Sequence, residues 1–384
     1  MNIDHAAEAA LNRICPYYTM FPLRFPYRIL RQYARPDDGV LDPFCGRGTT
    51  NYAARLLGIS SSAVDSNPVA VAITQAKAAT ATPDEVLHEY DMLLQTSLPV
   101  SVPQGTFWRL AYHPDVLDTL CRIRQQLLAL PQTGPRAALT GIILGALHGP
   151  KSKHGTSYFS NQSPRTFSPK PGYATRYWSM HKLWPDCVDV REIIAVRARR
   201  YYGHTSLDAS CTVVLGDARK EATWAEMNGA RYRWIITSPP YYGLRTYQAD
   251  QWIRAWFLGG CDRPLYRDPH QLSHNSPESF AAELRTVWRN VLAHAADGAR
   301  LVIRFGGIHD RSADPLAIIK DSLRGSGWRV CTRRSAGVAS RGRRQADHFQ
   351  PAPQAAREEF DIWASLDEAL STTTDSRQRS SPTA

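Results

Sequence analysis

A rigid aromatic turn is encoded by Ser238-Pro239-Pro240-Tyr241, which directly follows the apolar run that ends at Thr237. Each proline fixes its own φ at about −65° and keeps the preceding residue extended, so the turn cannot wind into a helix. Neither proline has an amide N–H, which leaves backbone carbonyls to accept other donors. The Ser238 hydroxyl, these carbonyls and the Tyr241 ring can together hold the exocyclic amino group of a planar base. A proline-rich turn with a purely structural role is the competing interpretation.

A βαβ unit is predicted near the N-terminus. Residues 39–50, GVLDPFCGRGTT, indicate a strand, a glycine-containing turn and a helix from Thr49 to Leu57, and Ser61 to Asp65 form the second strand. Asp42 and Asp65 therefore end adjacent strands. At such a site the glycines let a ligand approach the backbone, and the second acid can bind ribose hydroxyls.

Three interpretations of this unit are open. A nicotinamide dinucleotide site would have a third glycine where Asn51 stands, and it gives Asp42 no role. An S-adenosylmethionine site fits better, because the Asp42 carboxylate can hold the charged amino group of that ligand. A structural βαβ unit without a ligand is the third.

Composition favours a nucleic-acid partner in the cytoplasm. The 384 residues are enough for two lobes or for one core with a large insertion, and the net charge of +11 with a pI near 9.4 suits a polyanionic partner. The N-terminal residues contain no apolar signal region, and no run of eighteen apolar residues occurs. We therefore expect a cytoplasmic protein without a membrane span.

The seven cysteines are scattered and never spaced as C-x-x-C. This pattern argues against a disulfide framework and against a zinc site. The sequence thus predicts reduced, mostly buried thiols and no bound metal.

The middle of the chain combines helices with a basic, aromatic stretch. Apolar periodicity predicts helices from His113 to Leu130 and from Ala137 to Leu147. Residues 151–184 then contain no Asp or Glu, while aromatic side chains are interleaved with basic ones. Basic groups neutralise phosphates and aromatics stack on bases, so this stretch predicts nucleic-acid contacts. The candidate contact residues are Lys151, Lys153, Arg165, Lys170, Arg176 and Lys182. A loop-rich surface with some aromatics turned inward is the alternative.

The α/β pattern resumes after the basic stretch. A strand over 212–215 closes on Asp217, whose carboxylate could reach the exocyclic amine of an adenine or could cap the next helix. Helices are expected over 250–258, 277–293 and 315–323, and strands over 299–305, 328–332 and 359–363. The Ser/Thr/Arg-rich residues beyond 370 are expected to be disordered.

The segments Asp42-Pro43-Phe44-Cys45-Gly46-Arg47-Gly48-Thr49-Thr50 and Thr237-Ser238-Pro239-Pro240-Tyr241 together resemble the two signature motifs of the amino-methylating DNA methyltransferases. That family methylates N4 of cytosine or N6 of adenine. The resemblance implies a class I S-adenosylmethionine-dependent methyltransferase fold, which is α/β and Rossmann-like with a mixed, mostly parallel sheet. It also implies S-adenosylmethionine as cofactor and double-stranded DNA as partner.

The resemblance assigns roles residue by residue. Cofactor contacts are implied for Thr19 and Phe21 in an N-terminal strap, for Asp42, Phe44, Gly46, Gly48 and Thr49 in the first motif, for Asp65 and Asn67 at the ribose, and for Asp217 and Ala218 at the adenine ring. Residues 1–95 and 206–366 are expected to form the catalytic core, residues 96–205 an inserted, mainly helical and irregular target-recognition region, and residues 367–384 a disordered tail. The insertion precedes Gly216-Asp217-Ala218 instead of following it, which departs from the usual motif order of the family.

The second motif implies direct methyl transfer to an amino group. Ser238 and the Pro239 carbonyl would accept the two N–H bonds of the amine, and Tyr241 would stack on a base flipped out of the duplex. Methylation at cytosine C5 needs a nucleophilic cysteine, usually after proline, and the chain contains no Pro-Cys dipeptide. A serine at the first motif position resembles the N4-cytosine members.

Other functions compete with N4-cytosine methylation in a restriction-modification system. These are N6-adenine methylation of DNA, methylation of an RNA base such as a tRNA guanine, and nucleic-acid binding by a degenerate methyltransferase core. We expect a monomer or weak dimer, with any cognate restriction endonuclease acting as a separate protein.

Overall fold

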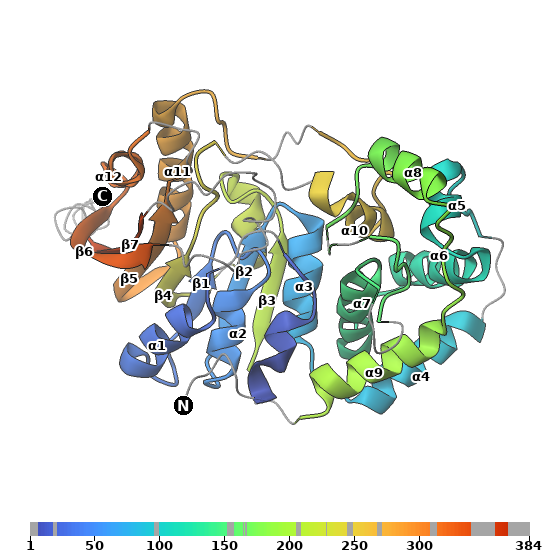
Figure 1. The fold of residues 1–384 in the computed structure, drawn as a ribbon. Helices are drawn as coiled ribbons and strands as arrows, with labels where there is room; N and C mark the ends of the chain where they lie inside the picture. The colour runs from blue at the N-terminus through green and yellow to red at the C-terminus, as the bar shows by residue number, and fades with distance from the viewer. Residues whose placement is uncertain are drawn as a thin grey trace, which may run out of the picture.

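A twisted, mostly parallel sheet forms the centre of the computed structural model (Figure 1). The structure describes residues 7–17, 21–95, 100–151, 157–163, 165, 167–204, 209–227, 229–243, 249–266, 271–307, 313–338 and 358–367. The strands are β1 (Val40–Asp42), β2 (Ser61–Asp65), β3 (Cys211–Leu215), β4 (Tyr232–Thr237), β5 (Ala295–Gly306), β6 (Trp328–Val338) and β7 (Glu358–Leu366). Their order is β3-β2-β1-β4-β5-β7-β6. The first five pair in parallel, and β7 runs antiparallel to both of its neighbours.

This order is that of a doubly wound Rossmann-like sheet with an antiparallel strand inserted near one edge. It is the class I methyltransferase fold, so the predicted fold class is confirmed. The strand order reverses between β1 and β4, and ligands of such sheets bind at the carboxyl ends of the strands beside that point.

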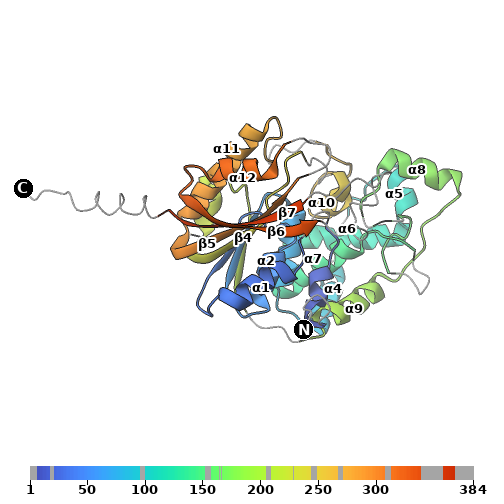
Figure 2. The ribbon, with the colours of Figure 1, turned by 60° about the vertical axis from the view of Figure 1, so that its left-hand side comes forward.

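Helices cover both faces of the sheet (Figure 2). On one side lie α1 (Arg24–Tyr33), α2 (Thr49–Arg55) and α3 (Pro68–Ala78), and on the other lie α11 (Pro277–Leu292) and α12 (Pro315–Leu323). The alternation of the strands explains these two layers, because successive side chains point to opposite faces. In β4, Trp234 and Ile236 belong to one buried cluster, whereas Ile235 belongs to the other.

A group of helices lies beside the sheet, at the right of Figure 1. Within the predicted insertion they are α5 (Thr106–Ala111), α6 (Pro114–Ala129), α7 (Gly134–Ala146), α8 (Pro171–Met180) and α9 (Val190–Tyr202). Two helices from outside its predicted bounds, α4 (Pro83–Gln95) and α10 (Trp252–Phe257), join them. Helix α7 packs so closely on α3 that a Cβ at Gly141 would lie only 2.3 Å from the Ala76 Cβ. The same buried cluster includes residues of both halves, such as Leu139 and Ile236. The predicted boundaries of the insertion stay a prediction.

Most elements follow the sequence predictions. Helices α6, α7, α11 and α12 and strands β5 and β7 occur where periodicity places them, and Ser276 caps α11. The basic stretch was expected to be irregular, but it contains α8. The prediction of mostly buried thiols is wrong: Cys15, Cys45 and Cys121 are buried, Cys211 is half-buried, and Cys187, Cys261 and Cys331 are exposed.

None of the described helices combines the length and the apolar character that a membrane crossing requires.

Candidate active site

The motif residues meet at one edge of the sheet. Asp42 and Asp65 are the last residues of β1 and β2, Asp217 follows β3, and Ser238 follows β4. These four strands are neighbours and run parallel, so their carboxyl ends lie together. The sequence prediction that the two motifs share a site is thus consistent with the topology.

Two glycines shape the loop between β1 and α2. Gly46 and Gly48 have φ values of 51° and 67°, in the left-handed region that favours glycine. A Cβ at Gly48 would also lie 2.6 Å from the Thr74 Oγ1 of α3. At Gly46 the nearest atom to such a Cβ is Tyr17 Cε1, at 3.8 Å. The loop therefore needs Gly48 for its packing, whereas Gly46 mainly provides a turn with an accessible backbone.

Asp65 connects this loop to the second strand. Its Oδ2 accepts a hydrogen bond from the Gly46 amide at 2.8 Å, and its Oδ1 accepts one from the Asn67 amide at 2.9 Å. Asn67 caps α3 and donates to the Tyr17 hydroxyl at 3.2 Å. Tyr17 thus lies beside the glycine loop, two residues before the predicted strap residue Thr19. Thr19 of the strap lies outside the described residues, and Phe21 packs edge-to-face on Phe25.

Asp42 is a fully buried carboxylate with one unused oxygen. Its Oδ1 accepts from the Phe44 amide at 3.1 Å, whereas Oδ2 has no hydrogen-bond partner in the described part of the chain. Burial raises the pKa of Asp42 to about 7, although the nearby Thr237 and Thr50 hydroxyls and the Phe44 amide lower it. A buried acid with a free oxygen is stabilised by a cationic ligand group, since opposite charge lowers the pKa and offsets the cost of burial.

Hydrogen bonds of two buried basic side chains also hold the β1–α2 loop in place. The buried Lys77 ammonium donates to Asn12 Oδ1 at 2.8 Å and to the Arg47 carbonyl, and Arg47 in turn donates to the Asn12 carbonyl. Burial lowers the pKa of Lys77 well below its usual value and that of Arg47 to about 10. The hydrogen bonds of Lys77 and Arg47 hold the 3₁₀ helix η2 (Ala7–Arg13) against the loop.

Cys45 has a packing role in this loop. Its side chain is buried beside Thr74, and burial raises the thiol pKa well above its usual value. A thiol with a raised pKa is a poor nucleophile near neutral pH. Cys45 is therefore a small residue that fits the loop and not a candidate nucleophile.

Asn51 explains why the loop departs from the dinucleotide fingerprint. It is 4% exposed, and its side-chain amide donates to the Ser62 carbonyl of β2 at 2.9 Å. A third glycine in that fingerprint allows close packing of helix and strand. Here a hydrogen bond joins α2 and β2 at the same place.

The Asp217 carboxylate already accepts hydrogen bonds from a neighbouring arginine. Arg219 donates to both carboxylate oxygens of Asp217, at 2.6 to 3.1 Å, and forms an ion pair with Glu283 of α11 at 2.6 Å. Burial alone would raise the pKa of Asp217, but these bonds outweigh it and the pKa lies below its usual value. Ala218 packs in the core, where its carbonyl accepts bonds from Trp224 and Asn290.

The turn after β4 presents unoccupied acceptors. Ser238 is half-buried, and no hydrogen bond within the described residues engages its hydroxyl or the Pro239 carbonyl. The turn is held next to the glycine loop, because the Thr50 hydroxyl of α2 donates to the Ile236 carbonyl at 3.1 Å. At the switch point of the sheet, two acceptors therefore have no donor among the residues that the structure describes.

Tyr241 is held in place from a distant strand. Its hydroxyl donates to Glu359 Oε1 of β7 at 2.9 Å, and its ring contacts Phe305 of β5 edge-to-face at 5.2 Å. Tyr242 packs edge-to-face on Phe280, and the Gly243 amide donates to His274 Nδ1 at 2.9 Å. The aromatic end of the turn is thus fixed by β5, β7 and the segment before α11.

The predicted nucleic-acid residues lie in the other half of the molecule. Lys170, Arg176 and Lys182 are exposed at or beside α8, and Arg165 is exposed as well. Lys151 forms an exposed ion pair with Asp186 at 3.0 Å, and Lys153 lies outside the described residues. Lys170, Arg176 and Lys182 thus lie at α8, which is a different part of the described structure from the motif loops.

The aromatics of the basic stretch divide into two groups. Phe159, Phe167 and Trp178 are buried, as the alternative interpretation expects. Tyr173, Tyr177 and Trp184 are exposed, by 72%, 44% and 68%. The Tyr173 and Tyr177 rings stack at 6.4 Å, and His181 packs on Tyr177 at 4.2 Å. Spacing of four residues puts the three rings on one face of α8, and we call them the α8 ladder.

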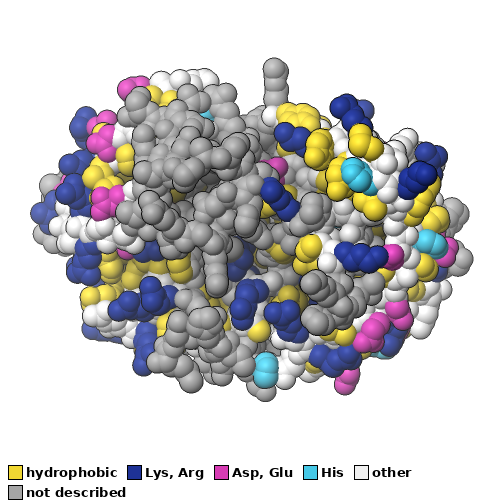
Figure 3. Space-filling model, viewed as in Figure 1, with side chains coloured by type: hydrophobic (Ala, Val, Ile, Leu, Met, Phe, Trp, Pro, Cys, Tyr) yellow, Lys and Arg dark blue, Asp and Glu magenta, His cyan; other side chains and the backbone are white. Residues whose placement is uncertain are grey.

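The α8 ladder lies among basic side chains. Figure 3 shows hydrophobic, basic and histidine side chains gathered at the upper right, where Figure 1 places α8. Exposed aromatic rings cost solvation free energy when no partner covers them, so such a patch marks an interaction surface.

Sequence reasoning missed several site residues. Glu283 and Glu359 reach the site only through contacts with Arg219 and Tyr241, which lie 64 and 118 residues away in the sequence. The one available signal was Arg219, which follows Asp217 by two positions and can fold back on it.

Residues 4–76 match the family model of the N6 and N4 methyltransferases, described as DNA methylase. The match to this DNA methylase family covers about a fifth of the chain. The matched residues include the strap, the β1–α2 loop, β2 and most of α3, so the resemblance predicted from these motifs is confirmed over this segment. A search of curated protein sequences finds no significant match.

Solved structures similar to this chain include several methyltransferases. The rRNA methyltransferase aviRa from Streptomyces viridochromogenes is 12% identical, with 94% of each chain covered and a TM-score of 0.37. An rRNA methylase from Streptococcus thermophilus is 9% identical, with 91% of this chain and 98% of that chain covered and a TM-score of 0.33. A SAM-dependent methyltransferase from Methanosarcina mazei is 11% identical, with 90% and 98% covered and a TM-score of 0.33. Similarity at this level says nothing about substrate.

Proposed function

We propose that the chain transfers a methyl group from S-adenosylmethionine to the exocyclic N4 of cytosine in duplex DNA. One observation carries the proposal. A buried acid with an unused oxygen, Asp42, and a turn with two unoccupied acceptors, Ser238 and Pro239, lie on adjacent strand ends at the switch point of the sheet. The first suits a cationic cofactor group, and the second suits an amino group.

The residues of the β1–α2 loop fit S-adenosylmethionine. Asp42 Oδ2 would accept from the charged amino group of the cofactor, whose positive charge offsets the burial of the carboxylate. The backbone at Gly46 and Gly48 would contact it with Phe44 and Thr49 alongside. Asp65 and Asn67 would lie at the ribose, beside the Gly46 amide that donates to Asp65.

Asp217 can accept a hydrogen bond from the adenine ring only if Arg219 gives up part of its hydrogen bonding to the carboxylate. A carboxylate offers about four lone-pair sites, and Arg219 donates four hydrogen bonds to Asp217. We infer that Arg219 releases part of Asp217 when the cofactor binds, and that its ion pair with Glu283 keeps the guanidinium charge compensated.

The chain's own groups prepare the amine for reaction. The amino nitrogen of cytosine is a poor nucleophile because its lone pair is delocalised into the ring. When the Ser238 hydroxyl and the Pro239 carbonyl accept its two N–H bonds, the nitrogen becomes pyramidal, its lone pair is freed, and the positive charge that develops on it is stabilised. S-adenosylmethionine supplies the electrophilic methyl group on its sulfonium. The nitrogen would take the methyl group directly, without a covalent enzyme intermediate. The electron pair of the broken methyl–sulfur bond stays on the departing thioether, and the methylated nitrogen then loses one N–H proton to water.

The target base must leave the duplex to reach this turn. An amino group inside a base pair cannot meet both acceptors, so the nucleotide is flipped out and held by stacking on Tyr241. The bond from Tyr241 to Glu359 would fix the ring plane before the base arrives.

Tyr241→Ala is expected to lower kcat/KM by about 5- to 150-fold, because stacking of a base on an aromatic ring contributes about 1–3 kcal/mol. Tyr241→Phe keeps the ring and loses the hydroxyl that bonds to Glu359, so its kcat/KM should fall by less than about tenfold. Steady-state kinetics with one DNA duplex measure both variants. Equal losses in the two variants would mean that the hydroxyl, and not the stacked ring, matters.

The α8 ladder and its basic neighbours are proposed to contact the DNA, with Lys170, Arg176 and Lys182 on phosphates and the rings on bases or sugars. The double variant Tyr173→Ala/Tyr177→Ala is expected to weaken DNA binding by at least tenfold with unchanged cofactor affinity. Fluorescence anisotropy at fixed salt measures this. Met92→Ala, an exposed apolar change on α4, is the control and should bind as the wild type does. Unchanged DNA affinity in the double variant would remove α8 from the interface.

Substrate class is tested by incorporation of a labelled methyl group. Duplex DNA and tRNA are offered separately with labelled S-adenosylmethionine, and we expect label in DNA alone. Label in tRNA alone would support the RNA base methyltransferase. If the protein binds S-adenosylmethionine but transfers label to neither DNA nor tRNA, cofactor binding stands and DNA is not the substrate. Within DNA, N6 of adenine is the alternative acceptor, and site protection in restriction-modification is the biological role that we propose.

A further inference from the structure

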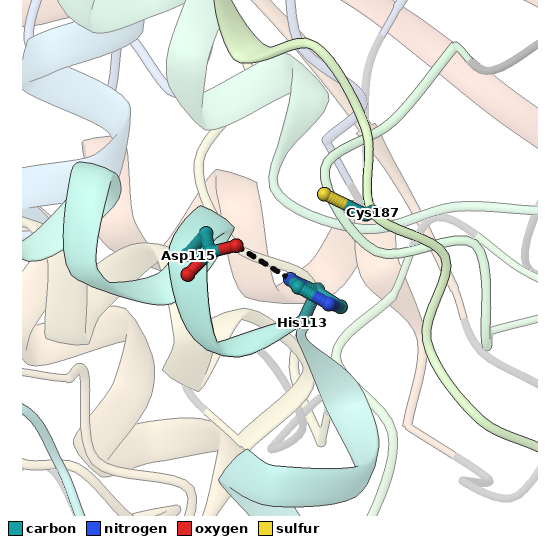
Figure 4. A group of neighbouring side chains, drawn as sticks. All are labelled: His113, Asp115 and Cys187. Carbon is teal, nitrogen blue, oxygen red and sulfur yellow. Dashed lines mark ion pairs between the residues drawn. The ribbon is translucent and has the colours of Figure 1, made fainter.

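Three side chains with metal-binding atoms meet in the inserted half, outside the proposed active site (Figure 4). His113 and Asp115 flank the start of α6, and Cys187 comes from the connection between α8 and α9. Their ligand atoms all lie within 4.8 Å of one another. The group joins two segments that are more than seventy residues apart in the sequence.

Other roles do not account for this arrangement. His113 occupies the N-cap position of α6, but its side chain makes no capping hydrogen bond. Its Nδ1 is buried without a hydrogen-bond partner in the described part of the chain, and it lies 3.5 Å from Asp115 Oδ2. An ion pair would explain why His113 and Asp115 lie close together. It would not explain why the free, exposed thiol of Cys187 lies beside them.

The separations suit a small transition-metal ion. Zn²⁺ binds sulfur at about 2.3 Å and nitrogen or carboxylate oxygen at about 2.0–2.2 Å. Two such ligands at tetrahedral angles lie roughly 3.4–3.6 Å apart, which matches the 3.5 Å between His113 and Asp115. The three ligand atoms lie within 4.8 Å of one another, so a shift of the exposed Cys187 side chain by at most about 1 Å gives tetrahedral separations.

We propose that His113, Asp115 and Cys187 bind Zn²⁺, with water as the fourth ligand. A thiolate and an imidazole favour zinc over magnesium or calcium, which prefer oxygen ligands. The thiolate and the carboxylate together balance the charge of the ion. The proposal departs from the expectation, based on the absence of C-x-x-C spacing, that the chain holds no metal.

The site would fasten the segment that follows α8 to α6. The neighbouring Asp186 already forms an ion pair with Lys151, and the Leu183 amide closes the end of α8 on the Trp178 carbonyl at 2.9 Å. A bound ion adds a stronger attachment to the same segment, and so stabilises α8 against unfolding of its C-terminal end. The inference does not depend on the proposed methyl transfer.

Metal binding to the full-length, reduced protein tests the site. The wild type, stripped with a chelator and titrated with Zn²⁺ against a chromophoric chelator, is expected to bind one equivalent at this site. Cys187→Ser should weaken that binding at least tenfold, and His113→Gln should weaken it similarly. Cys261→Ser is the matched control, because Cys261 is also an exposed free cysteine, and it should bind as the wild type does.

Cobalt gives a readout that a structural effect of the substitutions would not imitate. Co²⁺ added to the wild type and to Cys261→Ser should produce a thiolate charge-transfer band and the visible bands of a tetrahedral ion, and both should be lost in Cys187→Ser. Equal Zn²⁺ affinity of wild type and Cys187→Ser, or a charge-transfer band that survives in Cys187→Ser, would overturn the proposal, as would a wild type that binds no Zn²⁺.

Discussion

Asp42→Asn is expected to abolish binding of S-adenosylmethionine and, at the same time, to stabilise the protein above pH 7. The carboxylate provides the charge that would hold the cofactor's amino group, so its loss should weaken cofactor binding by at least 100-fold. The same carboxylate is buried with an unused oxygen, which costs free energy in the absence of ligand.

The pH dependence of this effect follows from the pKa of Asp42, which is raised from 3.8 to about 7 in the folded protein. Between these values the folded protein holds a proton that the unfolded chain has lost, so wild-type stability falls as pH rises through the window. Asp42→Asn lacks this ionisation. The free energy of unfolding of Asp42→Asn, relative to the wild type, should grow by about 1.4 kcal/mol per pH unit, to about 4 kcal/mol above pH 7.

Urea unfolding from pH 5 to pH 8 and calorimetric titration with S-adenosylmethionine measure the two effects. Asp262→Asn, an exposed change of the same kind, should show neither. Wild-type affinity for the cofactor should rise up to about tenfold per pH unit below pH 7, because binding requires the ionised acid. A variant that still binds the cofactor normally would show that Asp42 is a structural acid.

Ser238→Ala is expected to lower kcat by about 100- to 1,000-fold with little change in cofactor affinity. The hydroxyl is one of two acceptors proposed to hold the amine as positive charge develops on it, and removal of one such preorganised group costs about 2.7–4 kcal/mol. Neither acceptor is engaged within the described chain, so the substitution should leave the fold intact.

Single-turnover kinetics separate this chemical step from DNA binding and product release. Ser101→Ala, at an exposed position outside the motifs, is the control and should react at the wild-type rate. A Ser238→Ala enzyme within about threefold of the wild type would leave the Pro239 carbonyl as the only acceptor in the mechanism.

Local sequence patterns were sufficient to predict the core of the fold. The apolar run before Thr237 and the glycine turn after Asp42 are strong local signals, because a buried strand and a left-handed turn each restrict the residues that can form them. Their meeting at one edge then follows from parallel strand pairing, as the structure shows for β1 and β4.

The partners of the site residues could not be predicted in this way. Tyr241 bonds to Glu359 across 118 residues, and Arg219 bonds to Glu283 across 64, so no local period records either pair. Helix α8 was missed because its exposed rings, Tyr173 and Tyr177, break the apolar periodicity that marks a buried helix face.

The identity of the methylated base tests the central claim most directly. Purified protein is incubated with duplex DNA and labelled S-adenosylmethionine, the DNA is digested to nucleosides, and the labelled nucleoside is identified by mass spectrometry. The account predicts labelled N4-methylcytosine from the wild type and about 100- to 1,000-fold less from Ser238→Ala at equal time. Labelled N6-methyladenine alone, or no labelled nucleoside from a protein that binds the cofactor, would contradict it.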